Sequence, residues 1–140
     1  MLRIAVTGSR DIKDWIWIRD QMDWLIDNKL KDKKLSEVIF ILGDAAGVDK
    51  EVETYCVNYG LAFIKLRTLN HIYPAFTDKT VRPDLIKLMY LGRDIQVIEA
   101  CDWVFGLWDG HSTGTKFTLD EGKKQGKLVI IQQYIKKVDL

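Results

Sequence analysis

Five short apolar runs, separated by segments of helical periodicity, are the feature that most restricts the fold of this chain. The runs occupy residues 2–7, 37–42, 62–66, 102–108 and 128–133. They are continuous stretches rather than alternations of apolar and polar residues, which is typical of strands buried on both faces of a parallel sheet. Strands that alternate with helices predict an α/β fold, a Rossmann-like doubly wound parallel sheet of about five strands in the order 3-2-1-4-5.

The segments between the runs have the spacing of apolar residues that helices show. We predict helices over about residues 14–29, 48–59, 84–100 and 115–126. Asp14 is a suitable N-cap for the first helix, and Gly60 ends the second. The third is either unbroken or interrupted near Gly92. Residues 68–83 have no clear period, and we consider both a lid over a ligand and an ordinary crossover for them.

Length and composition are those of one globular domain spanning residues 1–140. The formal net charge of +1 argues against a general nucleic-acid-binding surface. No apolar run is long enough to span a membrane and the N-terminus lacks the layout of a signal peptide, so we expect a cytoplasmic location. Cys56 and Cys101 are expected to be buried free thiols, and the cysteines and histidines show no metal-ligand spacing.

Three glycine-containing loops follow predicted strands one, two and four. Residues 8–10 read GSR, residues 43–49 read GDAAGVD and residues 109–115 read DGHSTGT. In the predicted order, strands one and four are neighbours and the winding of the chain reverses between them. The loops therefore converge on the crevice beyond the C-terminal strand ends, where sheets of this kind bind ligands. The alternative is that all three are ordinary turns.

The loop at residues 109–115 has the composition of an anion site. Glycines let the backbone turn and let a ligand approach closely, and hydroxyl side chains cap a following helix. The free N–H groups at the start of that helix would then face a phosphate. Candidate ligand-binding residues of this loop are Asp109, Gly110, Ser112, Thr113, Gly114 and Thr115. Neither the dinucleotide fingerprint nor the ATPase phosphate-loop motif occurs in the chain.

Together these motifs resemble the SLOG superfamily, the Rossmann-like domains shared by the Smf/DprA proteins and the LOG enzymes, and in particular its small stand-alone YpsA-like branch. The resemblance is carried by TGSR at residues 7–10, GDAAGVD at residues 43–49, GRD at residues 92–94 and STGT at residues 112–115. It extends over nearly the whole chain, in the right order and spacing. It implies a crevice that binds nucleotides or nucleotide-derived molecules.

Carried over by position, the resemblance implies that each motif contributes residues to the crevice. These are Gly8, Ser9, Arg10, Gly43, Gly47, Asp49, Arg93, Gly110, Ser112, Gly114 and Thr115, and Asp44 lies in the same loops. Arginine offers a planar fork to phosphate, and Asp49 can accept hydrogen bonds from ribose hydroxyls. The alternatives are surface salt bridges for Arg10 and Arg93, and for Asp49 a charge favoured at a helix start.

The chain also departs from the family pattern. Asp44 stands where Gly is usual, Ala46 where Arg is usual and Asp94 where Asn is usual. Thr118 occupies the position of the LOG glutamate that takes part in cleaving an N-glycosidic bond, and a threonine cannot act as a carboxylate. Glu121, almost one helical turn further on, is the weak candidate to replace it. LOG-type hydrolysis is therefore disfavoured, and we lean against an enzyme.

We accordingly expect a module that senses, carries or sequesters a nucleotide or an NAD- or ADP-ribose-derived ligand, with no certain cofactor and no metal. The alternative is a LOG-like hydrolase or transferase that acts on the N-glycosidic bond of a nucleotide. DNA binding, as in the Smf/DprA relatives, is disfavoured by the near-neutral charge. A second apolar face at Trp17 and Trp24 favours a homo-oligomer, the alternative being burial of these side chains under a loop.

Overall fold

The computed structural model of the chain describes residues 1–68 and 83–136, and side chains in the second range from residue 87 onward. Most of the segment for which a lid or a crossover was considered, residues 68–83, lies outside the described residues. Within the described parts of the chain, none of the helices combines the length and apolar character needed to cross a membrane.

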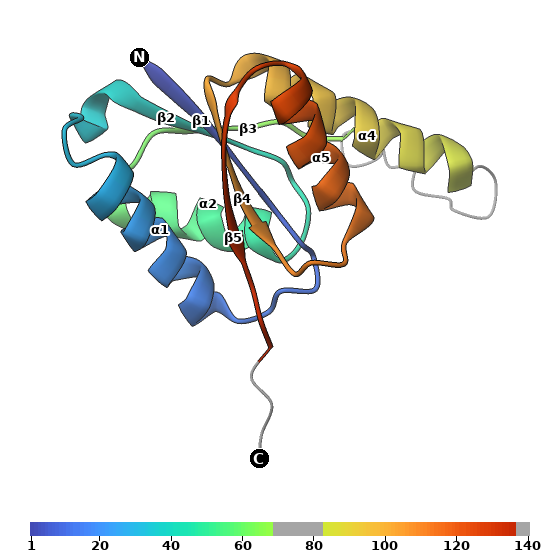
Figure 1. The fold of residues 1–140 in the computed structure, drawn as a ribbon, viewed down its shortest axis with the longest axis horizontal. Helices are drawn as coiled ribbons and strands as arrows, with labels where there is room; N and C mark the ends of the chain where they lie inside the picture. The colour runs from blue at the N-terminus through green and yellow to red at the C-terminus, as the bar shows by residue number, and fades with distance from the viewer. Residues whose placement is uncertain (69–82, 137–140) are drawn as a thin grey trace.

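The strands form a parallel sheet in the order β3-β2-β1-β4-β5 (Figure 1). Their bounds are Leu2–Gly8 for β1, Val38–Leu42 for β2, Phe63–Lys65 for β3, Trp103–Trp108 for β4 and Leu128–Gln133 for β5. In the register of the sheet, Ile4 of β1 pairs with Phe40 of β2 and with Trp103 of β4. This arrangement confirms the predicted α/β fold and strand order, with the winding reversed between β1 and β4.

Helices cover both faces of the sheet (Figure 1). Helices α1 (Trp15–Lys29) and α2 (Val48–Tyr59) lie on one face, and α4 (Pro83–Ala100) and α5 (Thr113–Lys124) lie on the other. A short 3-10 helix, η1 (Leu35–Glu37), precedes β2. The C-terminal ends of β1, β2 and β4 therefore meet the N-terminal ends of α2 and α5 at one edge of the molecule.

Alternate residues of the strands enter two separate cores, because successive side chains of a strand point to opposite faces. Ile4 and Val6 pack against α1 and α2, whereas Ala5 between them packs against α4 and α5. The first core takes from the helices Ile18, Met22, Leu25, Val48, Val52, Tyr55 and Cys56. Full burial of an aliphatic side chain of this size contributes about 1.5–3 kcal/mol, so these two cores hold the strand ends in place.

The start of α1 and the end of α2 agree with the prediction. The structure also decides whether the third predicted helix, α4, is interrupted near Gly92. The Asp14 carboxylate accepts a hydrogen bond from the backbone N–H of Trp17 at 3.1 Å, which makes it the N-cap of α1. Gly60 ends α2 in the left-handed conformation, with φ of 65°. Helix α4 is unbroken through Gly92.

Helix α5 spans Thr113–Lys124 rather than the predicted residues 115–126. The earlier start follows from Ser112, which takes the N-cap position and accepts the first helical hydrogen bond from Lys116 N at 3.2 Å. Gly114 therefore lies in the first helical turn, and not in a loop. At the other end, Gly126 has a φ of 74° and lies beyond the helix.

The tryptophan face proposed for self-association is partly buried within the chain. Trp17 contacts Tyr134 edge to face, with 4.9 Å between ring centroids, and Trp24 stacks on Phe105 at 6.2 Å. Both tryptophans pack against the core on the α1 side of the sheet. These contacts favour the alternative of partial burial within the chain, with Tyr134 from the segment after β5 packed on Trp17, and weaken the motive for a homo-oligomer through Trp17 and Trp24.

Candidate functional site

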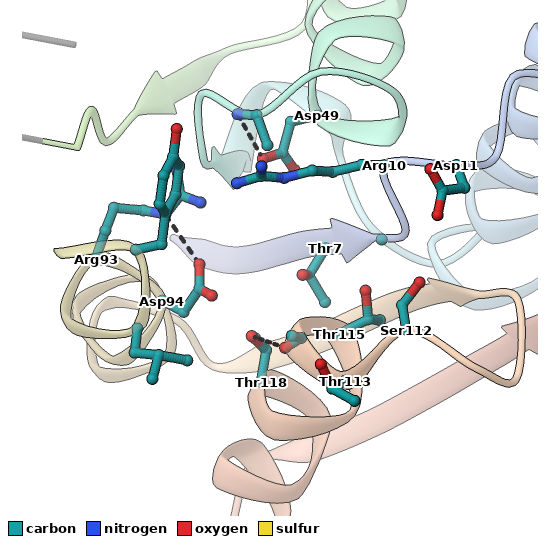
Figure 2. A pocket seen from close by; sticks show the side chains of 15 residues that line it. Thr7, Arg10, Asp11, Asp49, Arg93, Asp94, Ser112, Thr113, Thr115 and Thr118 are labelled. Atoms are coloured by element: carbon teal, nitrogen blue, oxygen red, sulfur yellow. Dashed lines mark hydrogen bonds and ion pairs between the residues drawn. The ribbon is translucent and has the colours of Figure 1, made fainter. Parts of the chain in front are cut away.

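A cavity of about 340 Å³ lies where β1 ends and α5 begins (Figure 2). Of the residues predicted from the sequence, it is lined by Gly8, Arg10, Asp49, Arg93, Ser112, Thr113, Gly114 and Thr115. In Figure 2, Arg10 and Asp49 lie along one side of the cavity, and the hydroxyl side chains of α5 lie opposite them. The cavity is therefore at the C-terminal end of β1, beside the point where the winding of the sheet reverses.

A second cavity, of about 380 Å³, adjoins the first. Ala45 and Asp49 line both cavities. The second is otherwise lined by the predicted Gly43 and Asp44 and by Ala46, Lys50, Glu53 and Lys65. Lys50 and Lys65 are exposed, and Lys65 Nζ pairs with a carboxylate oxygen of Glu53 at 3.0 Å. The two cavities together follow the edge of the sheet from α5 to β3.

Some predicted site residues line neither cavity and have supporting positions instead. Ser9 is buried, and its hydroxyl accepts a hydrogen bond from Asp109 N at 3.2 Å. Gly47 has a φ of 79° and lies so close to Arg10 that an added Cβ would come within 2.7 Å of the Arg10 carbonyl oxygen. Glu121 accepts a hydrogen bond from Gln125 at 3.0 Å and does not line the cavity beside Thr118.

The Asp109 carboxylate organises the loop before α5. It accepts hydrogen bonds from the backbone N–H groups of His111 and Ser112, both at 2.8 Å, and from the Ser112 hydroxyl at 2.9 Å. Partial desolvation acts to raise the pKa of Asp109, but these donors outweigh it and hold the pKa below its usual range. Asp109 therefore shapes the loop, and neither Asp109 nor the neighbouring Gly110 lines the two cavities.

The first turn of α5 forms part of the cavity wall. Thr113, Gly114 and Thr115 begin the helix, where backbone N–H groups have no intrahelical acceptor. All three residues line the cavity together with Thr118, whose hydroxyl donates to the Gly114 carbonyl at 3.1 Å. A helix N-terminus with unpaired N–H groups attracts anions. This turn has the chemistry of a phosphate site.

Arg93 is held by carboxylates of the protein itself. Its side chain is 6% exposed, with Nη1 2.6 Å from Asp44 Oδ1 and Nε 2.9 Å from Asp94 Oδ1. Asp44 also accepts a hydrogen bond from Thr68 N at 3.0 Å, and so joins the end of β2, the chain after β3 and α4. Arg93 thus forms a buried ion pair in the cavity wall, and not the surface salt bridge considered as the alternative.

Asp49 belongs with Asp44, Arg93 and Asp94 to one buried charged cluster. It is 7% exposed and accepts a hydrogen bond from Ala45 N at 3.1 Å. An added Cβ at Gly43 would lie 2.6 Å from both Asp49 Oδ2 and Arg93 Nη1, so only glycine leaves room for the cluster. Burial raises the pKa of Asp49 to about 6, against the opposing attraction of Arg93.

Arg10 and Tyr90 form the contact that sequence reasoning did not anticipate. The exposed Arg10 places its guanidinium carbon 4.4 Å from the centroid of the Tyr90 ring, and Arg93 lies 5.7 Å from the same centroid. Tyr90 precedes Arg93 by three residues, a helical spacing that places both on one side of α4. Other lining residues not predicted as ligand contacts are Thr7, Asp11, Ala45, Leu91, Asp94 and Thr118.

Within the described residues, His, Cys, Asp and Glu side chains form no group of three or more suited to a metal ion. Cys56 and Cys101 are buried free thiols, as predicted, and burial raises the pKa of both. The chemistry of the two cavities is therefore that of helix N–H groups, hydroxyls, an exposed arginine with an aromatic ring, and a buried carboxylate cluster.

A search for related structures finds DNA processing protein A from Helicobacter pylori, described for its unique single-stranded DNA binding mode. The match has a TM-score of 0.65 and 21% sequence identity, and it covers 99% of this chain and 68% of that chain. No family model and no curated protein matches the chain. At this level of identity the likeness shows the fold alone, a Rossmann-like fold that the chain shares with DNA processing protein A.

This neighbour contradicts two expectations drawn from the sequence. A small nucleotide or NAD-derived ligand was expected, with glycosidic-bond chemistry as the alternative, and nucleic acid was disfavoured as a partner. The protein that shares this fold binds single-stranded DNA. The net charge of +1 is a sum over the whole chain and does not by itself exclude a nucleic-acid partner.

Proposed function

We propose that this chain binds single-stranded nucleic acid, in the first place DNA, along the C-terminal edge of its sheet. The observation that carries the proposal is that two neighbouring cavities lie along this edge and share Ala45 and Asp49 in their walls. A hollow of this form suits an extended polymer that passes from α5 toward β3. The ligand of the structural neighbour supports the same class of partner.

The phosphate contacts come from the first turn of α5. The phosphates of the nucleic acid contact the backbone N–H groups of Thr113, Gly114 and Thr115. At this end of the helix the dipole favours negative charge. Such backbone contacts position a strand without reading its sequence. Binding at this turn is therefore independent of the base that each phosphate carries.

Positively charged side chains extend the phosphate contacts along the C-terminal edge of the sheet. Arg10 lines the first cavity and the exposed Lys50 lines the second, where Lys65 is paired with Glu53. Two of the acids in the wall, Asp44 and Asp94, are paired with Arg93, which limits their repulsion of a phosphate backbone. Neutralising backbone phosphates with Lys and Arg releases counterions and makes binding weaken with salt.

The test is a titration of a fluorescently labelled oligothymidylate with the protein at low salt, read by fluorescence anisotropy. Arg10→Ala removes the cation of the first cavity and is expected to lower affinity about tenfold, in the range of one good contact. Arg19→Ala is the matched control, because Arg19 lies on α1 outside both cavities and its side chain is 49% exposed. Equal affinities for the two variants would contradict the proposal.

A further inference from the structure

Tyr90 is the aromatic side chain described in the wall of the first cavity. Its ring faces two guanidinium groups, Arg10 at 4.4 Å and Arg93 at 5.7 Å from the ring centroid. The first turn of α5 lines the same cavity. A flat π surface therefore lies in the same hollow as the phosphate site.

The two arginines at this ring differ in how they are held. Arg93 is 6% exposed and is fixed by carboxylates of Asp44 and Asp94. Arg10 is exposed, and within the described residues it forms no ion pair. A guanidinium group stacked on a ring at a solvent-accessible site is a weakly held contact. Arg10 is thus the group that gives way when another flat group reaches Tyr90.

We propose that Tyr90 is a stacking platform for one unpaired base, and that Arg10 leaves the ring to pair with the phosphate backbone when the base arrives. This inference rests on the proposed binding of single-stranded nucleic acid and names the part of the strand that the first cavity takes. Every base has a π face, so stacking here tolerates any sequence. A base in a duplex is already stacked between its neighbours, so the platform selects single strands.

The arrangement resembles the general design of single-strand binding sites, in which a charged groove follows the backbone and an aromatic side chain stacks a base. Here the N-terminal turn of α5 and Arg10 supply the backbone contacts, and Tyr90 supplies the stack. Arg10 has a second role in the free protein, because its guanidinium covers an aromatic surface that would otherwise be more open to water.

The experiment compares two labelled oligonucleotides of equal length, an oligothymidylate and the corresponding strand of abasic sugar–phosphate units. Wild-type protein is expected to bind the strand with bases about tenfold more tightly than the abasic strand. Tyr90→Leu should remove this preference, and Tyr90→Phe, which keeps the ring, should retain it. Thermal denaturation establishes that the variants are folded.

The outcomes separate the two proposals. If wild-type protein binds neither strand, the proposed function itself is wrong. Two results would overturn this inference: equal binding of the two oligonucleotides by wild-type protein, or an equal loss of affinity for both in Tyr90→Leu. Either result means that the nucleic acid binds without a base stacked on Tyr90. The comparison of the oligothymidylate with the abasic oligonucleotide on wild-type protein shows whether bases contribute to binding, even without a variant. Arg10→Ala adds a separate check, since it should weaken binding of both strands and preserve the preference for bases.

Discussion

Asp44 Oδ1 lies 2.6 Å from Arg93 Nη1, and both side chains are almost fully buried. The resemblance to the family places glycine at position 44 and assigns Arg93 to the ligand. In this chain the added carboxylate instead holds the arginine in the wall of the cavity and connects α4 to the end of β2. Aspartate at position 44 therefore supplies a buried ion-pair partner to Arg93 in the cavity wall.

Replacing Asp44 with asparagine tests this relationship. Asparagine keeps an oxygen for Thr68 N but removes the charge that faces Arg93. We expect oligothymidylate affinity to rise about threefold or more because the cavity gains net positive charge, and the melting temperature to fall because a buried pair loses a partner. Asp120→Asn is the control, since Asp120 is exposed and pairs with Lys116 outside both cavities. Unchanged binding and stability in Asp44→Asn would contradict the account.

Replacing Asp49 with asparagine tests the buried carboxylate through its pH dependence. Burial raises the pKa of Asp49 to about 6 from the ordinary 3.8. Between these values the folded state binds the proton more tightly than the unfolded state, so stability falls as pH rises through this window and the cost is complete above about pH 6. The asparagine side chain cannot ionise, so we expect Asp49→Asn to melt about 3–6 °C higher than wild type near pH 7.5, with little gain near pH 4.

The control for that experiment is Asp11→Asn, an exposed carboxylate at the same cavity. It should leave the pH dependence of melting unchanged. Scanning calorimetry at several pH values makes the measurement. If Asp49→Asn raised the melting temperature equally at both ends of the pH range, ionisation of the buried Asp49 carboxylate would not be the cause of the gain.

Replacing Gly114 with alanine separates folding from ligand approach. No atom lies within 4 Å of the position of an added Cβ, and Gly114 is in the first turn of α5. Alanine should therefore keep or raise stability, since glycine in a helix costs roughly 0.5–1 kcal/mol. Binding of the oligonucleotide should weaken because the methyl group takes the space where the backbone of the strand approaches. Gly92→Ala, also helical with open space at its Cβ, is the matched control and should bind as wild type does.

Much of the fold could be predicted because its determinants are local and repeat along the chain. Continuous apolar runs alternating with helical segments lead to one sheet order, and that order places the loops after β1, β2 and β4 at one edge. Helix ends were less certain, as α5 shows, because the start at Thr113 depends on the Ser112 N-cap and on the loop that Asp109 holds together.

The contacts within the site could not be read from the sequence in the same way. Asp44 and Asp94 were recognised as departures from the family pattern, but their pairing with Arg93 depends on the packing of α4 against β2. Tyr90 was overlooked because a tyrosine in a helix has no motif, and only the tertiary structure places Arg10 against it. Trp17 and Trp24 seemed an outer face because the residues that pack on them, Tyr134 and Phe105 respectively, are distant in sequence.

The most direct test of the central claim is the salt dependence of oligothymidylate binding to the wild-type protein. Each phosphate neutralised on a single strand contributes a slope of about −0.7 to the logarithm of the binding constant against the logarithm of salt concentration. Contacts from both cavities predict a slope of about −1.4 or steeper, with a duplex of the same length competing poorly. Absence of binding at low salt, or binding that does not change with salt, would contradict the assignment of this edge to single-stranded nucleic acid.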